Sequence, residues 1–239
     1  MVVIQHEIAI GGRGGIAHEG RLLSHPSAYA CTGLIPLKPV PYAAAKRAID
    51  IALSLVFLIA LAPLLLMVAA LVRLTSRGPA IFKQTRVGEG GRLFTFYKFR
   101  SMYSDAEERR GELLAMNEAS GPVFKIKNDP RITPLGRIIR KYSIDEMPQF
   151  YNVLRGDLSI VGPRPPIPSE VAEYGERERG RLSVRPGLTC LWQISGRSDI
   201  QFDRWMDLDL HYIDTMSLRT DLSIFFRTIP AVLTARGAH

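Results

Sequence analysis

Residues 51–72 read IALSLVFLIALAPLLLMVAALV, and this stretch decides the architecture of the chain. It is apolar apart from Ser54 and Pro63. As a helix it would reach about 33 Å, which is enough to cross the hydrocarbon core of a bilayer. The core helix of a globular protein rarely stays apolar on all sides for this length. The stretch therefore predicts a segment that inserts into a membrane.

The ends and the middle of this segment indicate that it enters and leaves the membrane on the same side. Basic residues flank both ends, namely Lys46, Arg47, Arg73 and Arg77. Basic flanks favour the cytoplasmic face, so both ends are expected there. Pro63 removes a helical hydrogen bond and predicts a kink, which leaves two legs of about 10 to 12 residues, each too short to cross alone. We therefore expect a re-entrant helix–break–helix over residues 41–77, with a proline-kinked single span as the alternative.

The composition limits the class of protein. The chain has 239 residues, of which 46% are apolar and 23% are charged, and this excludes a disordered chain and a transporter with many spans. Lys and Arg total 31 against 23 Asp and Glu, a formal net charge of +8. Such a chain favours nucleic acid, a nucleotide substrate or an anionic membrane face as its partner. Cys31 and Cys190 cannot form a disulfide framework, and no Cys/His spacing resembles a zinc site.

Three parts follow one another along the chain. Residues 1–40 carry glycine and proline without a helical or strand period, and they lack the apolar core of a signal peptide, so they predict a flexible leader. The membrane segment follows, and Asp50 near its start is expected to pair with Lys46 or Arg47 at the interface. Residues 78–239 are expected to form a globular domain on the cytosolic side.

The globular part combines short strands with helices. Ala80–Phe82 and Leu93–Phe99 are β-prone, and the glycine-rich residues 87–91 between them predict a hairpin turn. Asp157–Val161 predicts a further short strand. Helical patterns cover Ser104–Met116, Val171–Leu182, Phe202–Tyr212 and Asp221–Ala235, and the range Arg137–Arg155 contains helix. The expected fold class is therefore α+β, an N-terminal re-entrant membrane helix pair followed by a mostly helical domain with short strands.

Two adjacent acids in the stretch Ser143-Ile-Asp-Glu-Met-Pro148 are the first candidates for chemistry. Ser143 and Glu146 have the spacing of a capping box, and Pro148 is tolerated within a first helical turn. Asp145 and Glu146 are therefore expected at a helix N-terminus, where the dipole keeps Asp145 ionised and neighbouring amides can hold phosphate. Such acids can serve as nucleophile, general base or magnesium ligands. An ordinary acidic first turn is the other interpretation.

Arginines beside proline and glycine turns are the second group of candidates. In residues 162–166, Gly-Pro-Arg-Pro-Pro, the prolines fix the backbone around Arg164 and allow a cis bond. A rigid arginine suits bidentate phosphate contact, although a solvated arginine in a proline-rich turn is the competing interpretation. Later turns bracket a strand and would bring Arg185 and Arg197 together. Trp192 between them could stack on a base, but a core position is commoner for tryptophan.

The remaining candidates give weaker signals. Lys98 and Arg100 end the phenylalanine-rich strand and add two cations. Asp207 and Asp209 could bind a metal, although a polar helix face explains their spacing as well. The sequence contains no Walker-type phosphate loop, no dinucleotide glycine fingerprint and no serine-elbow motif.

Together these segments resemble the bacterial sugar transferase family, the monotopic phosphoglycosyl transferases, over residues 46–238. The resemblance is carried by motifs that occur in the family's order: Lys46-Arg-Ala-Ile-Asp50, Gln84-Thr-Arg-Val-Gly88, Tyr97-Lys-Phe-Arg-Ser-Met102, Asn128-Asp-Pro-Arg-Ile-Thr133, Ser143-Ile-Asp-Glu-Met-Pro-Gln149, Gly162-Pro-Arg-Pro165 and the block from Arg185 to Arg197. So many motifs at family spacing make the match specific.

The resemblance implies a membrane-embedded bacterial enzyme, a phosphotransferase for substituted phosphate groups. Such an enzyme passes a sugar-1-phosphate from a UDP-sugar to polyprenyl (undecaprenyl) phosphate and releases UMP. The lipid-linked sugar then begins an exopolysaccharide, capsule or O-antigen (lipopolysaccharide) repeat unit. The implied location is the inner (cytoplasmic) membrane, with the catalytic domain on its cytosolic face. A homodimer is compatible with this reading, and nucleic acid is not an expected partner.

Roles for individual residues follow from the same resemblance. Asp145 would be the nucleophile on the β-phosphorus and would form a covalent phosphosugar intermediate. Glu146 would help to hold Mg²⁺ or manage the proton, and Asp145, Glu146 and Asp209 are the expected metal ligands. The residues expected to hold the phosphates or the nucleotide are Lys98, Arg100, Arg140, Arg164 and Arg197.

Two other functions stay open on the residues alone. One is a non-enzymatic, membrane-anchored basic scaffold, although the basic residues lie beside turns and do not form a single stripe. The other is a phosphohydrolase that uses Asp145 with water as the acceptor. Loss of transfer on replacing Asp145 separates the enzyme from the scaffold, and dependence on polyprenyl phosphate separates it from the hydrolase.

Overall fold

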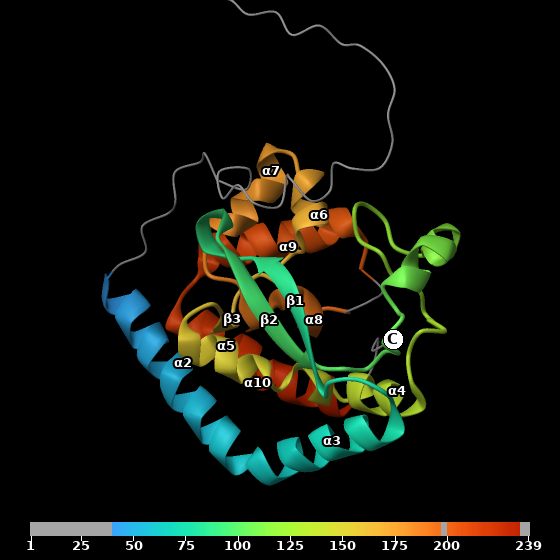
Figure 1. Ribbon diagram of the computed structural model, residues 1–239. Coiled ribbons are helices and arrows are strands. Elements are labelled where there is room, and N and C mark those ends of the chain that lie inside the picture. The colour runs from blue at the N-terminus through green and yellow to red at the C-terminus, as the bar shows by residue number, and fades with distance from the viewer. Residues whose placement is uncertain (1–39, 197–199, 235–239) are drawn as a thin grey trace, which may run out of the picture.

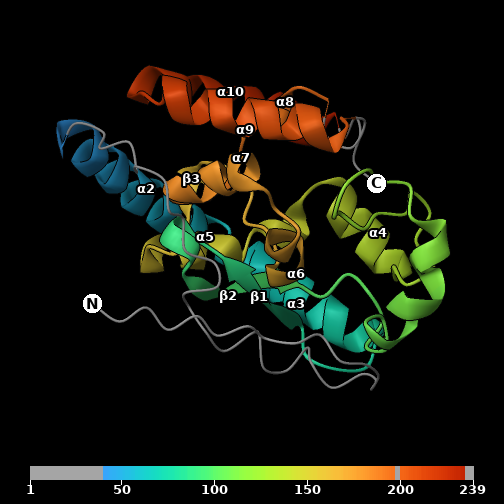
Figure 2. The same ribbon diagram turned by 90° about the horizontal axis from the view of Figure 1, so that it is seen from above.

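The fold combines helices with two small sheets (Figures 1 and 2). The computed structural model describes residues 40–196 and 200–234. Most of the described residues are helical, so the expected mixed and mostly helical class is confirmed. The predicted leader over residues 1–40 lies outside these ranges, apart from its last residue.

The N-terminal helices form a bent pair, α2 (Val40–Ala60) and α3 (Ala62–Thr75). The two are bent by 62° at the break. Pro63 lies in the first turn of α3, where its missing N–H costs no helical hydrogen bond. Within residues 40–196 and 200–234, no single helix is both long and apolar enough to cross a bilayer, whereas the bent pair passes that test jointly. The predicted break beside the proline is therefore confirmed.

Both legs are longer than the 10 to 12 residues or so that the sequence predicts. α2 has 21 residues and α3 has 14. The first leg is longer because α2 begins at Val40, ahead of the apolar stretch. Residues 43–47, three alanines followed by Lys and Arg, are strong helix formers.

Polar side chains on one face of α2 bond to the globular part. Lys46 forms an ion pair with Asp221 at 2.8 Å, and Arg47 donates to two backbone carbonyls at 2.6 and 2.8 Å. Asp50, which is 3% exposed, accepts a hydrogen bond from the backbone N–H of Ile160 at 3.0 Å. The predicted pairing of Asp50 with Lys46 or Arg47 is therefore wrong, because each of these groups finds a partner outside the helix.

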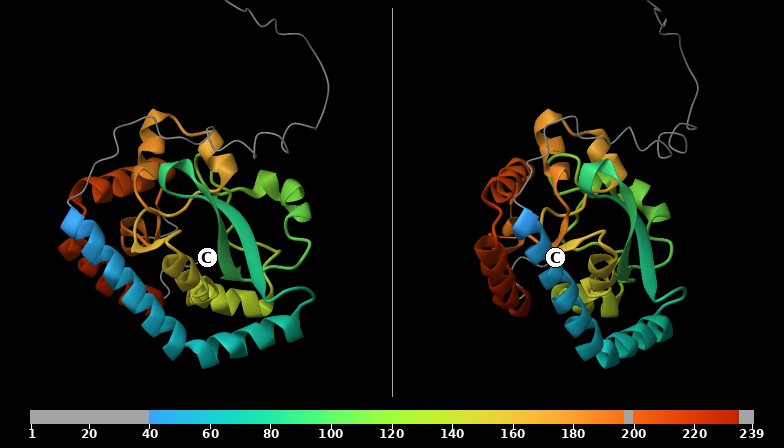
Figure 3. Two further views of the ribbon diagram at one scale, coloured as in Figure 1. Left: turned by 60° about the vertical axis from the view of Figure 1, so that its left-hand side comes forward. Right: turned by 90° about the vertical axis from the view of Figure 1, so that its left-hand side faces the viewer.

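Much of the remaining surface of the pair is apolar and exposed. The exposed apolar side chains are Ile51, Leu55, Val56, Ile59, Leu66, Met67, Leu71 and Leu74. On the inner side, Val68 and Val72 of α3 pack against Phe99 and Ile139. Figures 1 and 3 show the pair along one edge of the body. The pair is thus fastened to the globular part and presents an apolar surface outward.

The two sheets have two strands each. β1 (Ile81–Val87) and β2 (Leu93–Phe99) are antiparallel, with Ile81 opposite Phe99 and Val87 opposite Leu93. The turn η2 (Glu89–Gly91) joins them with positive φ at Gly90 and Gly91, so the predicted hairpin is confirmed with a longer first strand. β3 (Ser159–Val161) and β4 (Gly187–Thr189) pair in parallel.

The remaining helices are mostly short. They are η3 (Glu108–Met116), α4 (Pro134–Lys141), η4 (Ile144–Glu146), α5 (Gln149–Arg155), α6 (Pro168–Ala172), α7 (Glu176–Arg179), η5 (Gly180–Ser183), α8 (Leu191–Ile194), α9 (Phe202–Thr215) and α10 (Leu218–Leu233). The helices predicted near residues 202–212 and 221–235 are confirmed as α9 and α10.

Two predicted helices are wrong in length or type, whereas the helix expected within residues 137–155 is present as α4, η4 and α5. The helix predicted over residues 171–182 becomes α6, α7 and η5. The first part of residues 104–116 forms turns, and the rest winds as the 3₁₀ helix η3. Gly175 and Gly180 shorten the helices between residues 168 and 183, because glycine lowers helix propensity.

The main core lies between β2, α5, β3, α9 and α10. Its buried side chains are Phe94, Phe96, Val153, Leu158, Ile160, Val161, Val184, Tyr212, Ile213 and Ile224. Leu53 of α2 packs against the same cluster. The core therefore joins the bent pair to the strands and turns that carry the candidate site.

Candidate active site

Asp145 and Glu146 lie on η4, a single 3₁₀ turn between α4 and α5. Ser143 before them has a left-handed backbone with φ of 54°, and its side chain forms no capping hydrogen bond. It is the one non-glycine residue with positive φ in the described part of the chain. The predicted capping box is therefore wrong. Backbone strain of this kind costs about 1 to 3 kcal/mol and concentrates at functional sites.

Asp145 is buried beside positive charges. Burial raises the pKa of its carboxyl to about 7 and the charge of Glu146 adds to the rise, whereas Lys98 and Arg140 lower it. Desolvation thus outweighs the cations around Asp145 and lifts the pKa of its carboxyl above the usual range. Burial also lowers the pKa of the Lys98 ammonium to about 8, and the charges of Arg140 and Arg86 act in the same direction.

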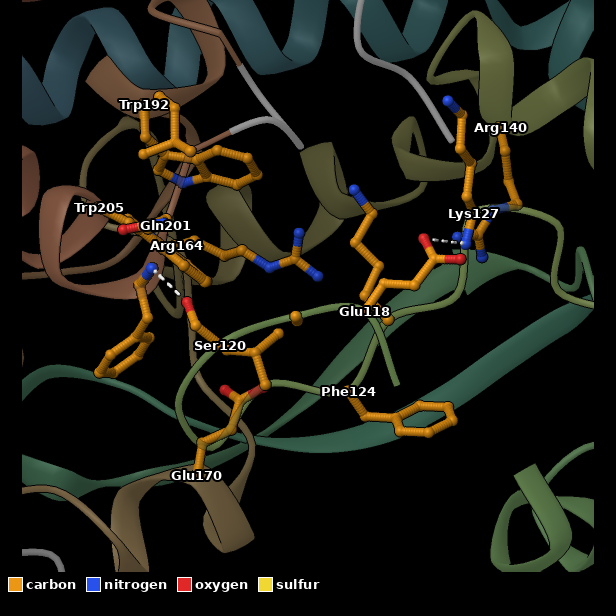
Figure 4. A pocket seen from close by; sticks show the side chains of 15 residues that line it. Glu118, Ser120, Phe124, Lys127, Arg140, Arg164, Glu170, Trp192, Gln201 and Trp205 are labelled. Carbon is orange, nitrogen blue, oxygen red and sulfur yellow. Dashed lines mark hydrogen bonds between the residues drawn. The ribbon is translucent and has the colours of Figure 1, made fainter. Parts of the chain in front are cut away.

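A cavity of about 430 Å³, the large cavity, lies beside these groups (Figure 4). Its walls include Lys127, Arg140, Arg164, Trp192 and Trp205. Figure 4 shows the Arg164 side chain pointing into the cavity, with Lys127 and Arg140 on one side of it and the two tryptophans on the other. The large cavity therefore has a cationic end, whose wall also includes Glu118, and an aromatic end.

Two smaller cavities share walls with the large one. The small cavity, about 30 Å³, is lined among others by Lys98, Glu146 and Arg164. The α4 cavity, about 160 Å³, is lined by Asn128, Asp129 and Ile132 together with the cations Lys127, Arg137, Arg140 and Lys141. Arg164 thus lies in the walls of the small and large cavities, and Arg140 in those of the large and α4 cavities.

The structure brings most of the predicted site residues together. The charges of Asp145, Arg140 and Arg164 act on the pKa of Lys98, and those of Glu146, Lys98 and Arg140 act on the pKa of Asp145. This arrangement can attract a multiply charged anion and place it against a buried carboxylate. The peptide bonds around Arg164 are trans, so the cis bond that the prolines allow is not present there.

Arg100 and Arg197 are not placed in this group. Arg100 is buried, and its Nη2 atom donates to the carbonyl and hydroxyl of Ser76 at 2.8 and 2.9 Å and to the carbonyl of Val72 at 3.3 Å. It fixes the end of α3 and lines none of the three cavities, which corrects the predicted substrate contact. Arg197 lies outside the described residues.

The predicted metal ligands do not all meet. Asp209 is 1% exposed and forms an ion pair with Arg181 at 2.5 Å. In the part of the chain that the structure describes, no three His, Cys, Asp or Glu side chains gather closely enough to hold a metal ion. The expected set of Asp145, Glu146 and Asp209 therefore does not gather in the structure, because Asp209 pairs with Arg181.

Several residues of the site had no role in the prediction. Arg86 lines the small cavity and donates to the carbonyl of Pro165 at 2.8 Å, and Lys127 and Trp205 line the large cavity. Arg86 and Lys127 lie within or next to the motifs at residues 84–88 and 128–133, so those motifs were the available signal. The sequence contains no signal for Trp205, because its position in the helical pattern is typical of a core residue.

The chain was compared with known proteins. The model of the bacterial sugar transferase family matches residues 41–235. The galactosyl transferase CpsE of Streptococcus agalactiae is 48% identical over 195 residues, which are 81% of this chain and 43% of that protein. The undecaprenyl-phosphate galactose phosphotransferase of Salmonella typhimurium is 43% identical over 198 residues, 81% of this chain and 41% of that protein. The exopolysaccharide production protein ExoY of Sinorhizobium fredii is 40% identical over 198 residues, 81% of this chain and 88% of that protein.

The chain spans less than half the length of the first two relatives and most of the third. The matched region includes the bent helix pair, η4 and all the cavity walls described above. The chain belongs to the bacterial sugar transferase family.

Proposed function

We propose that this protein transfers a sugar-1-phosphate from a UDP-sugar to polyprenyl phosphate, through a covalent intermediate on Asp145. The observation that carries the proposal is the buried Asp145 carboxyl with Lys98 and Arg140 around it, next to a cavity that has a cationic end. The printed names of relatives, among them an undecaprenyl-phosphate galactose phosphotransferase, support the same class of reaction.

The first half of the reaction uses Asp145 as the nucleophile. A carboxylate oxygen attacks the β-phosphorus of the donor, the bond from that phosphorus to the bridging oxygen breaks, and UMP leaves with the electron pair. Lys98, Arg140 and Arg164 hold the diphosphate and offset the negative charge that builds up during attack. Because the three cations belong to β2, α4 and the turn after β3, the fold holds them in place before the donor arrives.

The second half returns the sugar-phosphate to the lipid. An oxygen of the polyprenyl phosphate attacks the same phosphorus, the bond from phosphorus to Asp145 breaks, and the carboxylate is regenerated. The α4 cavity suits this acceptor because cations line it and because α4 packs through Ile139 against Val68 and Val72 of α3. A lipid phosphate bound there would lie close to the apolar helix pair and to Arg140.

Magnesium fits the acids in one particular way. Mg²⁺ in such sites usually takes one or two carboxylates together with substrate phosphates and water. Glu146, which lines the small cavity with Lys98 and Arg164, and the adjacent Asp145 offer that many protein ligands, and within residues 40–196 and 200–234 no third acid joins them. When bound, the ion would spread the charge of the diphosphate.

The bent pair would anchor the enzyme in the bacterial inner membrane. Its exposed apolar side chains suit the acyl region, and the polar bonds of Lys46, Arg47 and Asp50 tie the start of α2 to the globular part. Arg77 follows the end of α3. A re-entrant pair with both ends on the cytosolic face satisfies these groups together.

Release of UMP tests this function. The purified, detergent-solubilised protein is given Mg²⁺, polyprenyl phosphate and one UDP-sugar at a time. We expect release with at least one sugar, dependent on the lipid phosphate and lost in Asp145→Asn. UMP release that continues at the full rate without any lipid phosphate would indicate a hydrolase. If a folded protein releases no UMP with any of the sugars, the result would favour a scaffold.

A further inference from the structure

The segment that carries Arg164 has few N–H groups of its own. Pro163, Pro165 and Pro166 have no backbone N–H to donate. The segment is therefore held mainly through its carbonyl oxygens and its packing. Its four successive carbonyls each accept a bond: Pro163 from the N–H of Gly187 at 2.8 Å, Arg164 from Arg181 at 2.8 Å, Pro165 from Arg86 at 2.8 Å and Pro166 from the N–H of Val87 at 2.9 Å.

The bond to the carbonyl of Arg164 itself comes from a buried ion pair. Nη2 of Arg181 donates both to Asp209 Oδ2 at 2.5 Å and to that carbonyl at 2.8 Å, and Nη1 donates to the hydroxyl of Tyr174 at 2.8 Å. The side chains of Arg181 and Asp209 are each 1% exposed. Because an unpaired buried guanidinium is strongly unfavourable, Asp209 is what allows Arg181 to stay in this position.

The same pair supports the aromatic end of the large cavity. The guanidinium carbon of Arg181 lies 5.0 Å from the ring centroid of Trp205. The ring of Trp205 lies 4.9 Å from that of Trp192, and the guanidinium carbon of Arg164 lies 5.9 Å from the Trp192 ring. Arg164 is thus supported twice from Arg181, through its own carbonyl and through the two tryptophan rings, which contact each other at a tilt of 43°.

We propose that Arg181 and Asp209 form a positioning pair that holds Arg164 in the large cavity for contact with the phosphates of the donor. The inference rests on the proposed function, in which Arg164 binds the donor. Neither residue of the pair contacts the reacting atoms, so their effect passes through Arg164. Asp209 then serves the reaction through an ion pair and not as a metal ligand.

The two tryptophans of the chain provide a direct readout, because both belong to this cluster. Titration of UDP into the full-length protein, followed by tryptophan fluorescence, reports binding beside Arg164 without turnover. A shift of a catalytic group by about 1 Å costs about 100-fold. We therefore expect Asp209→Asn and Arg181→Lys to weaken UDP binding and kcat/KM by about 10- to 100-fold. Lys keeps the charge of Arg181 but cannot serve three acceptors in one plane.

Asp207→Asn is the matched control. Asp207 lies on the same helix, α9, and pairs with Arg177 of α7, but both side chains are nearly half exposed. This variant should bind UDP and turn over as the parent does. In an Arg164→Gln background, adding Asp209→Asn should cause little further loss of UDP binding or kcat/KM, because the side chain that Asp209 helps to position is already absent.

Two results would overturn the positioning role. One is parental UDP binding and turnover in folded Arg181→Lys, and the other is full additivity of Asp209→Asn with Arg164→Gln. Quenching of tryptophan fluorescence by acrylamide, measured without ligand, should rise in both pair variants and not in Asp207→Asn. If quenching rises in both pair variants while the parent protein fails to bind UDP, the donor class in the proposed function is wrong, but Arg181 and Asp209 still position Arg164. If quenching is unchanged in both pair variants, Arg181 and Asp209 do not position Arg164.

Discussion

The carboxyl group of Asp50 accepts a hydrogen bond from the backbone N–H of Ile160 at 3.0 Å, across 110 residues of sequence. Asp50 lies in α2, and Ile160 is the middle residue of β3, which leads directly into the segment that carries Arg164. The bond therefore connects the apolar helix pair to the strand that precedes Arg164, the side chain that we propose binds phosphate. It also explains how an acid is tolerated at the start of an apolar stretch.

Replacing Asp50 by Ala should destabilise the protein. The N–H of Ile160 would stay buried without an acceptor, which costs about 1 to 3 kcal/mol. Thermal or denaturant unfolding in detergent measures the loss, and Glu112→Ala, at an exposed position of η3, is the control. Equal stability of the two variants would show that the bond contributes nothing.

The pH dependence of kcat/KM should be bell-shaped. Asp145 must be ionised to attack, and burial raises its pKa to about 7, so activity rises with pH through that value. Lys98 must be protonated to hold phosphate, and its pKa is lowered to about 8, so activity falls above it. Because the two groups interact, the measured values belong to the pair. The pH–rate profile of the parent with saturating acceptor measures both limbs.

Lys98→Gln is the variant that assigns these limbs. Removing the ammonium should abolish the alkaline limb, and it should move the acid limb upward because Lys98 lowers the pKa of Asp145. An acid limb that stays at the parental pH in this variant would contradict the assignment.

Arg100 and Arg164 should behave differently although the sequence predicts the same role for both. Arg100→Gln removes the bonds that fix the end of α3, so it should lower the unfolding temperature and leave the KM for the UDP-sugar unchanged. Arg164→Gln should raise that KM, by about tenfold or more for a lost charged contact of about 1.5 to 3 kcal/mol. Steady-state kinetics and a thermal scan of both variants measure the difference. A raised KM in folded Arg100→Gln would restore its predicted place at the substrate.

The orientation of the bent pair can be read with single cysteines. Val40 at the start of α2 and Arg77 after α3 are exposed and outside the polar anchors, so each can be replaced by Cys in a chain without Cys31 and Cys190. A re-entrant pair places both on the cytosolic face, so a membrane-impermeant thiol reagent should label both only in inverted vesicles. Labelling of one position from the periplasmic side would show a single span.

The features of the fold that are determined by neighbouring residues in the sequence could be predicted. Pro63 breaks the apolar helix, and the glycine-rich residues 87–91 turn the β1–β2 hairpin, because each acts on its own backbone. The adjacent acids and Arg164 were found for the same reason, since proline and acid motifs are local signals.

The parts that depend on tertiary contacts could not be predicted. The partners of Asp50, Arg100 and Asp209 lie far from them in the chain, at Ile160, near Ser76 and at Arg181. Without these contacts, the local pattern gave Asp50 a local pair, and the family resemblance gave Arg100 and Asp209 functional roles. Likewise, the spacing of Ser143 and Glu146 fits a capping box, but the backbone at Ser143 is left-handed, and nothing in the local sequence required that.

Mass spectrometry of the digested protein tests the covalent intermediate on Asp145 most directly. The protein is incubated with Mg²⁺ and its UDP-sugar without polyprenyl phosphate, quenched in acid and digested. We predict an added mass of one sugar-phosphate on the peptide that contains Asp145, absent in Asp145→Asn and removed when polyprenyl phosphate is supplied. An adduct on another residue, or transfer to the lipid by Asp145→Asn at the parental rate, would contradict the account.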